Sequence, residues 1–168
     1  MGVEIERKFL LRNERWRVAV ERTVVMAQGY LNDAAALDTG AQRASVRVRL
    51  QDDVAFLNIK SREVGLRRQE FEYPLPVDEA RALLELCVGG RIAKRRHLVR
   101  HGRHLWEIDE FEGDNAGLVV AEIELGDEQE AFERPDWLGD EVTHLQRYYN
   151  LALADRPYRE WSAGERGA

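Results

Sequence analysis

The chain has 168 residues, of which 44% are hydrophobic and 33% are charged, and its formal net charge at pH 7 is −6. This length fits one domain with a sizeable core, and the negative charge excludes a general electrostatic attraction to nucleic acid or anionic lipid, although it leaves room for a local basic pocket. Cys87 is the single cysteine, which excludes an intramolecular disulfide, and its apolar neighbours predict a buried structural thiol.

The first predicted strand, residues 3–10, carries different chemistry on its two faces, because alternate side chains leave a strand on opposite sides. The apolar face, which we expect to meet a core, holds Val3, Ile5 and Phe9. The charged face holds Glu4, Glu6 and Lys8. Taken alone, this strand favours a solvated charged face. Two neighbouring carboxylates, however, repel each other unless water, a cation or a metal lies between them.

The same alternation predicts seven more strands. Their ranges are 23–31, 44–51, 54–60, 67–75, 91–100, 104–111 and 118–125. The turns and loops between them are expected at 32–42, 52–53, 61–66, 101–103 and 112–117. Short connections favour antiparallel pairing, and eight strands are enough to close a small barrel without exposed edges.

Helical signals are fewer. The expected helices cover residues 13–21, 78–88, 128–132 and 141–153. Asn13 and Asp78 are the expected N-caps of the first two, and Gly89-Gly90 is expected to end the second. The tail beyond Pro157 is polar, which is typical of a mobile chain end.

Two absences set the expected compartment. No apolar run approaches membrane-spanning length, and the N-terminus lacks the basic start and apolar stretch of a signal peptide. We therefore expect a cytoplasmic protein without a membrane partner.

The charged faces of several strands carry side chains of like sign at positions i and i+2, and other strands add single charges to the same faces. The acidic members are Glu4, Glu6, Glu70, Glu72, Glu107, Asp109, Glu122 and Glu124. The basic members are Lys8, Arg47, Arg49, Lys60, Arg68, Lys94 and Arg96. Like charges on one face are destabilising, so the repetition makes sense if these faces converge on one lumen that holds divalent cations and a polyanion. The apolar faces would then point outward, against helices or a dimer partner.

The residue types of this lumen select a chemistry. Carboxylates without histidine or cysteine at metal-ligand spacing suit Mg²⁺ or Mn²⁺ and argue against zinc. Clustered arginine and lysine suit phosphate oxygens. The combination indicates phosphoryl transfer or hydrolysis, and the chain lacks the Gly-x-x-x-x-Gly-Lys-Ser/Thr loop of a P-loop enzyme.

The opening Glu4-Ile5-Glu6-Arg7-Lys8 resembles the Glu-x-Glu-x-Lys signature of the CYTH superfamily, the triphosphate tunnel metalloenzymes. Later stretches resemble that family's elements in order: Gln28-Gly29-Tyr30-Leu31, Val46-Arg47-Val48-Arg49, Ile59-Lys60-Ser61, Arg68-Gln69-Glu70-Phe71-Glu72, Lys94-Arg95-Arg96-His97, Glu107-Ile108-Asp109-Glu110-Phe111, Ala121-Glu122-Ile123-Glu124-Leu125 and Trp137-Leu138-Gly139-Asp140-Glu141-Val142-Thr143. The resemblance implies an α+β protein, mainly antiparallel β, with a closed eight-stranded tunnel-like barrel, a charged lumen and helices packed outside. It looks like the short bacterial branch, with one domain over residues 1–155 and a polar tail over 156–168.

The resemblance also implies roles for individual residues. The implied metal ligands are Glu4, Glu6, Glu122 and Glu124, with Asp109 assisting. The implied triphosphate contacts are Lys8, Arg47, Arg49, Lys60, Lys94 and Arg96. Tyr30 and Lys94 are expected to form a catalytic dyad near the scissile phosphate, although a half-buried structural tyrosine is an alternative for Tyr30. Glu70 and Glu72 are expected to bind a second metal, orient a water or pair with basic residues. No role is assigned to His97, and the surface histidines are expected to be His101, His104 and His144.

Three functions stay open. The first is hydrolysis of inorganic tripolyphosphate to pyrophosphate and phosphate with Mg²⁺ or Mn²⁺. The second keeps the scaffold but acts on thiamine triphosphate, or cyclises ATP, and needs an organic-base pocket for which the candidates are Trp16, Tyr30, Trp106 and Trp137. The third is a non-catalytic polyphosphate- or nucleotide-binding module. In each case the expected partner is a small-molecule triphosphate and not nucleic acid, and a homodimer is expected from the outward apolar faces.

Overall fold

The computed structural model describes residues 2–62 and 67–167, and within them the dominant feature is a nine-stranded antiparallel sheet. The strands are β1 (Gly2–Leu11), β2 (Val20–Tyr30), β3 (Ala44–Gln51), β4 (Val54–Ser61), β5 (Arg67–Leu75), β6 (Val88–His101), β7 (His104–Phe111), β8 (Val119–Glu124) and β9 (Leu138–Glu141). The α-helices are α1 (Ala34–Asp38), α2 (Val77–Glu85), α3 (Asn150–Asp155) and α4 (Ala163–Arg166).

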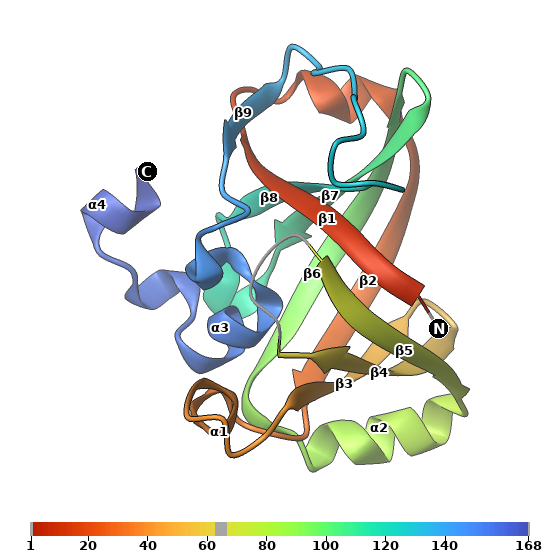
Figure 1. The fold of residues 1–168 in the computed structure, drawn as a ribbon, viewed down its shortest axis with the longest axis vertical. Coiled ribbons are helices and arrows are strands. Elements are labelled where there is room, and N and C mark those ends of the chain that lie inside the picture. Colours follow the sequence, from red (N-terminus) through yellow and green to blue (C-terminus); the bar gives the residue numbers. More distant parts are fainter. Residues whose placement is uncertain (1, 63–66, 168) are drawn as a thin grey trace.

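The sheet closes on itself through β1. The first part of this strand, Gly2–Ile5, pairs with β5, and the part from Glu6 to Leu10 pairs with β8. The first eight strands therefore form a closed barrel in the order β5-β4-β3-β2-β6-β7-β8-β1. β9 lies alongside the far end of β1, as Figure 1 shows. The prediction of a closed, eight-stranded antiparallel barrel is confirmed.

The apolar side of the barrel wall is covered by the other elements. α2 packs against β3 and β4 at one end of the barrel (Figure 1), where Ala80 and Leu84 contact Val48 and Ala55. A second cluster surrounds Phe9 and Trp106 on the outer side of β1 and β7. The charged faces of the strands are left to point inward, as the alternation predicted.

The N-terminal helix predictions need correction. Residues 13–21 form no α-helix. Instead, a 3₁₀ helix covers Arg15–Ala19, and the Asn13 side chain accepts a hydrogen bond from the backbone N–H of Arg15 rather than capping an α-helix. The expected loop 32–42 contains α1, whose N-cap is Asp33. Most of the expected loop 61–66 lies outside the described residues.

The helix predicted over residues 78–88 is shorter than expected: it ends at Glu85, and Val88 already begins β6. α2 begins at Val77 with Pro76 as its N-cap, so Asp78 lies in the first turn. Gly89 and Gly90 belong to β6. A Cβ on these glycines would lie 3.2 and 3.0 Å from the carbonyl oxygen of Ala154, so they allow the close approach of α3.

The C-terminal third differs most from expectation. Residues 128–132 form a turn and an irregular segment instead of a helix. The range 141–153 is helical only in part: residue 141 ends β9, a 3₁₀ helix covers Gln146–Tyr148, and α3 begins at Asn150. The tail is ordered: a 3₁₀ helix over Tyr158–Glu160 precedes α4, and Trp161 is 4% exposed in a core cluster with Tyr148 and Leu153. In the described part of the chain, none of the helices has both the length and the apolar character needed to span a bilayer.

Candidate functional site

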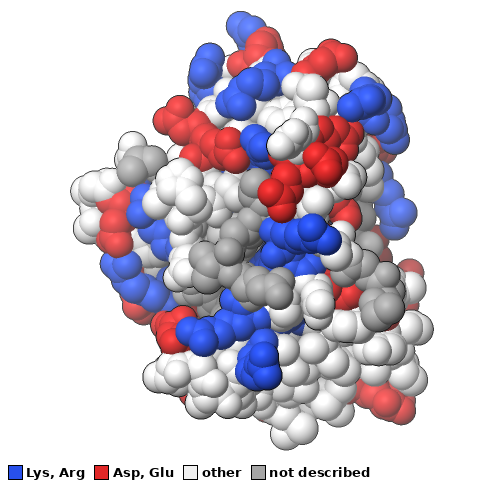
Figure 2. Space-filling model, viewed as in Figure 1, with Lys and Arg blue, Asp and Glu red and all other residues white. Residues whose placement is uncertain are grey.

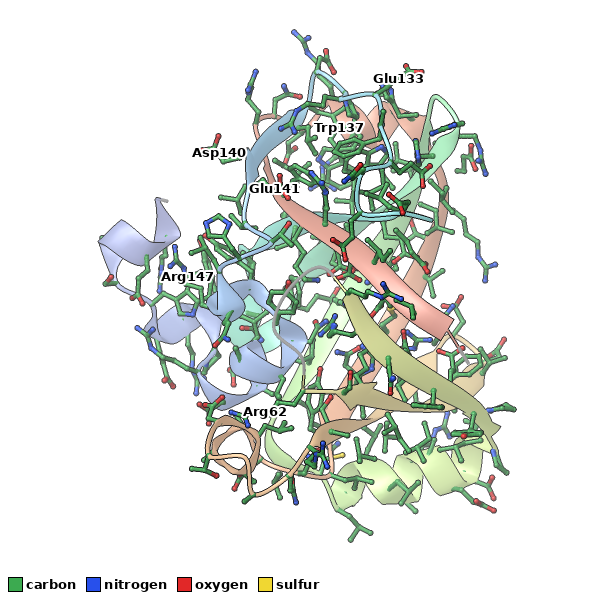
Figure 3. All side chains as sticks on the ribbon, in the orientation of Figure 1. Arg62, Glu133, Trp137, Asp140, Glu141 and Arg147 are labelled. Carbon is green, nitrogen blue, oxygen red and sulfur yellow. The ribbon has the colours of Figure 1, made fainter. Side chains whose placement is uncertain are left out.

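The interior of the barrel contains a cavity of about 590 Å³ that is lined mostly by charged side chains. The predicted site residues that line it are Glu4, Glu6, Lys8, Tyr30, Arg47, Arg49, Lys60, Glu70, Glu72, Arg96, Glu122 and Glu124. Figure 2 shows basic side chains gathered in the middle of one face, next to a band of acidic ones. Arg62, which also lines the cavity, lies near α1 and donates a hydrogen bond to the carbonyl oxygen of Asp38 at 2.7 Å (Figure 3).

Strand register explains why acids and bases meet. Antiparallel partners point to the same face of a sheet, so directly opposed residues on inward faces become neighbours in the lumen. β1 sets Glu4 opposite Arg68 and Lys8 opposite Glu122. Strands β4 and β5 likewise set Lys60 opposite Glu70. The barrel thus pairs charges from segments far apart in the sequence.

The N-terminal strand supplies two carboxylates that are each held by cations. Both oxygens of Glu4 accept hydrogen bonds from the Lys60 ammonium at 2.9 Å, and Arg68 donates to Glu4 at 3.4 Å. Glu6 lies 2.6 Å from the Lys8 ammonium. These pairs hold Glu4 and Glu6 in the lumen next to groups that can contact a phosphate.

Lys8 and Glu122 form the most buried pair of the lining. Their side chains hydrogen bond to each other, and Arg96 donates to the other oxygen of Glu122 at 2.8 Å. Burial alone would lower the pKa of Lys8, but the charges of Glu122 and Glu6 outweigh it and raise that pKa. Burial likewise opposes ionisation of Glu122, yet Lys8 and Arg96 hold its pKa well below the usual range. Both groups are therefore charged at neutral pH.

Lys94 and Asp109 lie buried beside the cavity, at 1% and 0% exposure. The Lys94 ammonium donates to Asp109 at 2.5 Å and to the Asn150 side-chain oxygen at 3.3 Å. Burial lowers the pKa of Lys94 to about 8, against the opposing charge of Asp109. Asp109 also accepts two hydrogen bonds from Arg96 at 2.7 Å, so cations hold both of its oxygens.

Tyr30 is buried at the wall of the cavity. Burial raises the pKa of its hydroxyl, and the nearby charges of Arg47, Arg68 and Lys8 act in the opposite direction. Tyr30 therefore faces the basic side of the lumen, while Lys94 has Asp109 as its partner.

Glu70 and Glu72 both pair with other side chains of the barrel. Asn58 donates to Glu70 at 2.9 Å and to Glu72 at 2.7 Å. Arg49 donates to Glu72 at 2.8 Å, and Lys60 lies 3.5 Å from Glu70. These contacts support one of the three roles expected for Glu70 and Glu72, which is pairing with basic residues.

On the acidic side of the lumen, Glu124 lies close to other carboxylates. The pKa of Glu124 is raised, first by burial and then by the charges of Glu4, Glu6 and Glu70. Divalent cations such as Mg²⁺ bind oxygen donors, and these carboxylates supply only oxygen. In the part of the chain that the structure describes, no three His, Cys, Asp or Glu side chains are grouped as a ready-made metal site. The donor chemistry therefore fits a hard cation that binds by replacing existing ion pairs.

Sequence reasoning missed several residues of the site. Asn58 is fully buried between two predicted site residues, and its position two residues before Lys60 on an inward face was the available signal. Tyr149 lines the cavity from a segment without strand alternation, so no periodic signal could identify it. The expectation that His104 lies on the surface is wrong, because His104 is only 9% exposed and hydrogen bonds to Glu130.

A family model described as CYTH domain matches residues 2–155. A relative from Acetivibrio thermocellus, described as an inorganic triphosphatase, is 41% identical over 162 residues, which cover 96% of this chain and 99% of the relative. A second relative with the same description, from Nitrosomonas europaea, is 36% identical over 154 residues, which cover 90% of this chain and 96% of the relative.

Solved structures show the same barrel. The crystal structure of an inorganic triphosphatase matches with a TM-score of 0.64 and 34% identity, covering 92% of this chain and 95% of that chain. A Hippeastrum protein matches with a TM-score of 0.55 and 17% identity over 76% of this chain and 80% of its own, which supports the fold alone. Because the family model and both relatives span nearly all of the sequence, the chain belongs to the CYTH domain family.

Proposed function

We propose that this protein is a metal-dependent hydrolase that cleaves inorganic tripolyphosphate to pyrophosphate and phosphate. The observation that carries the proposal is one cavity in which cationic and carboxylate side chains from separate strands meet. Two relatives at 41% and 36% identity, both described as inorganic triphosphatases, support the same activity.

The basic side of the lumen would bind the substrate. The proposed phosphate contacts are Lys8, Arg47, Arg49, Lys60, Lys94 and Arg96. Guanidinium and ammonium groups stabilise the charge that spreads over phosphate oxygens in the transition state, and this stabilisation is the largest part of phosphoryl-transfer catalysis. Tyr30 and Lys94 remain the proposed dyad near the scissile phosphate. A pKa of about 8 for Lys94 allows its amine to lose a proton near neutral pH.

The acidic side would hold Mg²⁺ or Mn²⁺. The proposed ligands are Glu4, Glu6, Glu122 and Glu124. When bound, such a cation supplies positive charge to the phosphate oxygens. Asp109 was expected to assist the ligands. Because Lys94 and Arg96 hold both of its oxygens, we propose that it orients these two cations.

The placement of the tryptophans favours an inorganic substrate. A nucleoside or thiamine group would need an aromatic or hydrogen-bonding surface at the cavity. Trp16, Trp106 and Trp137 are at most 4% exposed and belong to core clusters, as does Trp161. In the described chain the aromatic residues that line the cavity are Tyr30 and Tyr149, and both lie against its cations. Thiamine triphosphatase or adenylate cyclase activity is therefore the second choice.

The test is a substrate panel. Phosphate release is measured from tripolyphosphate, ATP and thiamine triphosphate, with Mg²⁺ and with Mn²⁺, and cyclic AMP is measured in the ATP reactions. We expect the highest kcat/KM on tripolyphosphate. A preference for an organic triphosphate would contradict the proposed substrate, and no turnover with either metal would favour a binding module.

The cellular location, the domain boundary and the oligomeric state are also proposals. The cytoplasmic location and the domain boundary at residue 155 come from the sequence. A homodimer would cover exposed apolar side chains of the barrel wall such as Val25, Val54 and Tyr73, which are about half exposed. Light scattering at several concentrations tests the dimer directly.

A further inference from the structure

Tyr149 stands between the two basic groups that border the acidic side of the cavity. Its ring centroid lies 4.8 Å from the Lys8 ammonium and 5.3 Å from the Arg68 guanidinium carbon. Both cations also contact Glu6, at 2.6 Å for Lys8 and 4.0 Å for Arg68. The single ring of Tyr149 therefore contacts two cations that belong to different strands, β1 and β5.

The Tyr149 hydroxyl fixes this ring to the backbone that carries Lys8. It donates a hydrogen bond to the carbonyl oxygen of Thr143 at 2.7 Å. The Thr143 hydroxyl accepts from the backbone N–H of Lys8 at 3.0 Å and donates to Glu141 at 2.8 Å. Glu141 ends β9 beside β1, as Figure 3 shows. Ring and lysine thus share one rigid frame.

We propose that Tyr149 is a positioning residue of the tunnel, whose ring holds Lys8 and Arg68 in the orientation in which they bind a triphosphate. The attraction of a cation to an aromatic face is largest where water is excluded. Lys8 is 2% exposed and the Arg68 side chain 19% exposed, so both contacts are partly desolvated. The sequence pattern placed Arg68 on an inward face without a role. With this proposal, Arg68 joins the residues that bind the substrate.

The carboxylates alone do not define these orientations. Glu6 contacts both cations, and Glu4 also contacts Arg68. When a triphosphate or a metal competes for these groups, the ion pairs exchange, whereas the neutral ring has no such competitor. Tyr149 would therefore hold the two cations in place while their carboxylate partners change. This inference rests on the proposed function, because it assigns Tyr149 to triphosphate binding.

The first test compares Tyr149→Leu with Tyr149→Phe in the full chain, by steady-state hydrolysis of tripolyphosphate and by calorimetric binding of tripolyphosphate. Loss of two cation–π contacts in Tyr149→Leu should raise KM and Kd about fivefold to tenfold, with a smaller change in kcat. Tyr149→Phe keeps the ring and loses only the hydrogen bond to Thr143, so its KM should rise by clearly less than that of Tyr149→Leu. An unchanged KM in Tyr149→Leu, or equal losses in both variants, would overturn the inference.

The matched control is Tyr158→Leu. Its ring also faces a cation, the Arg166 guanidinium at 5.0 Å, and packs against Trp161 at 5.1 Å, but it lies outside the cavity. We expect a lower melting temperature with no change in KM. A rise in KM that matches that of Tyr149→Leu would show that loss of stability alone explains the effect and would count against the inference.

A second series keeps the test decisive if Tyr149→Leu does not fold. In this series Tyr149→Phe is compared with variants in which Tyr149 is replaced by phenylalanine that carries one, two or three ring fluorines, which weaken the negative face of the ring with little change in shape. KM should rise steadily with the number of fluorines, and a constant KM would contradict the proposal. If the unchanged protein neither binds nor hydrolyses tripolyphosphate, the proposed function itself fails, which is a separate result.

Discussion

Two glutamates of β8, two residues apart on one inward face, have opposite electrostatic surroundings. Glu122 stands opposite Lys8, and Glu124 stands opposite Glu6. Cations hold the pKa of Glu122 low, whereas burial and neighbouring carboxylates raise the pKa of Glu124. The same substitution at the two sites should therefore change stability in opposite directions.

Glu124→Gln should abolish hydrolysis while leaving the melting temperature at pH 7 equal or higher, because a repelled charge is removed. Since the folded pKa of Glu124 is raised, this gain should disappear as pH falls below that pKa.

Glu122→Gln should lower the free energy of unfolding at pH 7 by about 3 kcal/mol, because it leaves buried cations without their partner. That loss should shrink as pH falls below about 4.3, the carboxyl pKa in the unfolded chain. Urea unfolding at several pH values measures both, and equal effects at the two sites would contradict the assignment.

Lys94 gives a prediction about pH and activity. Because burial lowers its pKa to about 8, its neutral form becomes abundant at a pH where an exposed lysine is still charged. If the neutral amine takes part in catalysis, kcat should rise with pH and level off above about pH 8, near this pKa. The rise should be absent from the residual activity of Lys94→Arg and Lys94→Gln. A pH profile that keeps its shape in both variants would assign the rise to the substrate or to another group.

At the scale of elements, the segment after α3 differs most from the prediction, because its polar composition indicated a mobile tail and the structure shows it packed against the core. Trp161 packs against Tyr148 at 5.1 Å, and Arg156 forms a two-pronged pair with Glu165 at 2.7 and 2.8 Å. A chain that ends at residue 155 should therefore lose about 3 kcal/mol or more of unfolding free energy, the usual cost of deleting a buried tryptophan. A chain that ends at residue 162 keeps Trp161 and should lose much less. Urea denaturation distinguishes them, and equal stability of the full and shorter chains would show that residues 156–168 are a dispensable tail.

Elements formed by local alternation were predictable, and those decided by distant partners were not. The residues of β3 and β7 are those that inward and outward alternation predicted, 44–51 and 104–111. The range 138–141 has no such local signal and becomes β9 only because the end of β1 offers a free edge. The site followed the same rule. Alternation put Lys94 and Asp109 on an inward face, but their depth depends on α3, whose Asn150 contacts Lys94.

At the scale of the whole molecule, the barrel wall neutralises its own lumen. Lys8, Lys60, Arg49 and Arg68 each have a carboxylate partner in the wall itself. The barrel is also closed by backbone pairing of β1 with both β5 and β8, which does not depend on a ligand. Metal should therefore be needed for activity and not for folding.

Chelation tests this separation of roles. Addition of EDTA should abolish hydrolysis of tripolyphosphate and change the melting temperature of the substrate-free protein by less than about 3 °C, the shift that roughly 1 kcal/mol produces in a domain of this size. Tripolyphosphate with Mg²⁺ at about 100 times its Kd should instead stabilise the fold by roughly 2.7 kcal/mol. Scanning calorimetry with activity measured on the same samples gives both results. Unfolding on chelation would mean that the carboxylates of β1 and β8 need the cation to coexist, and that the metal is structural.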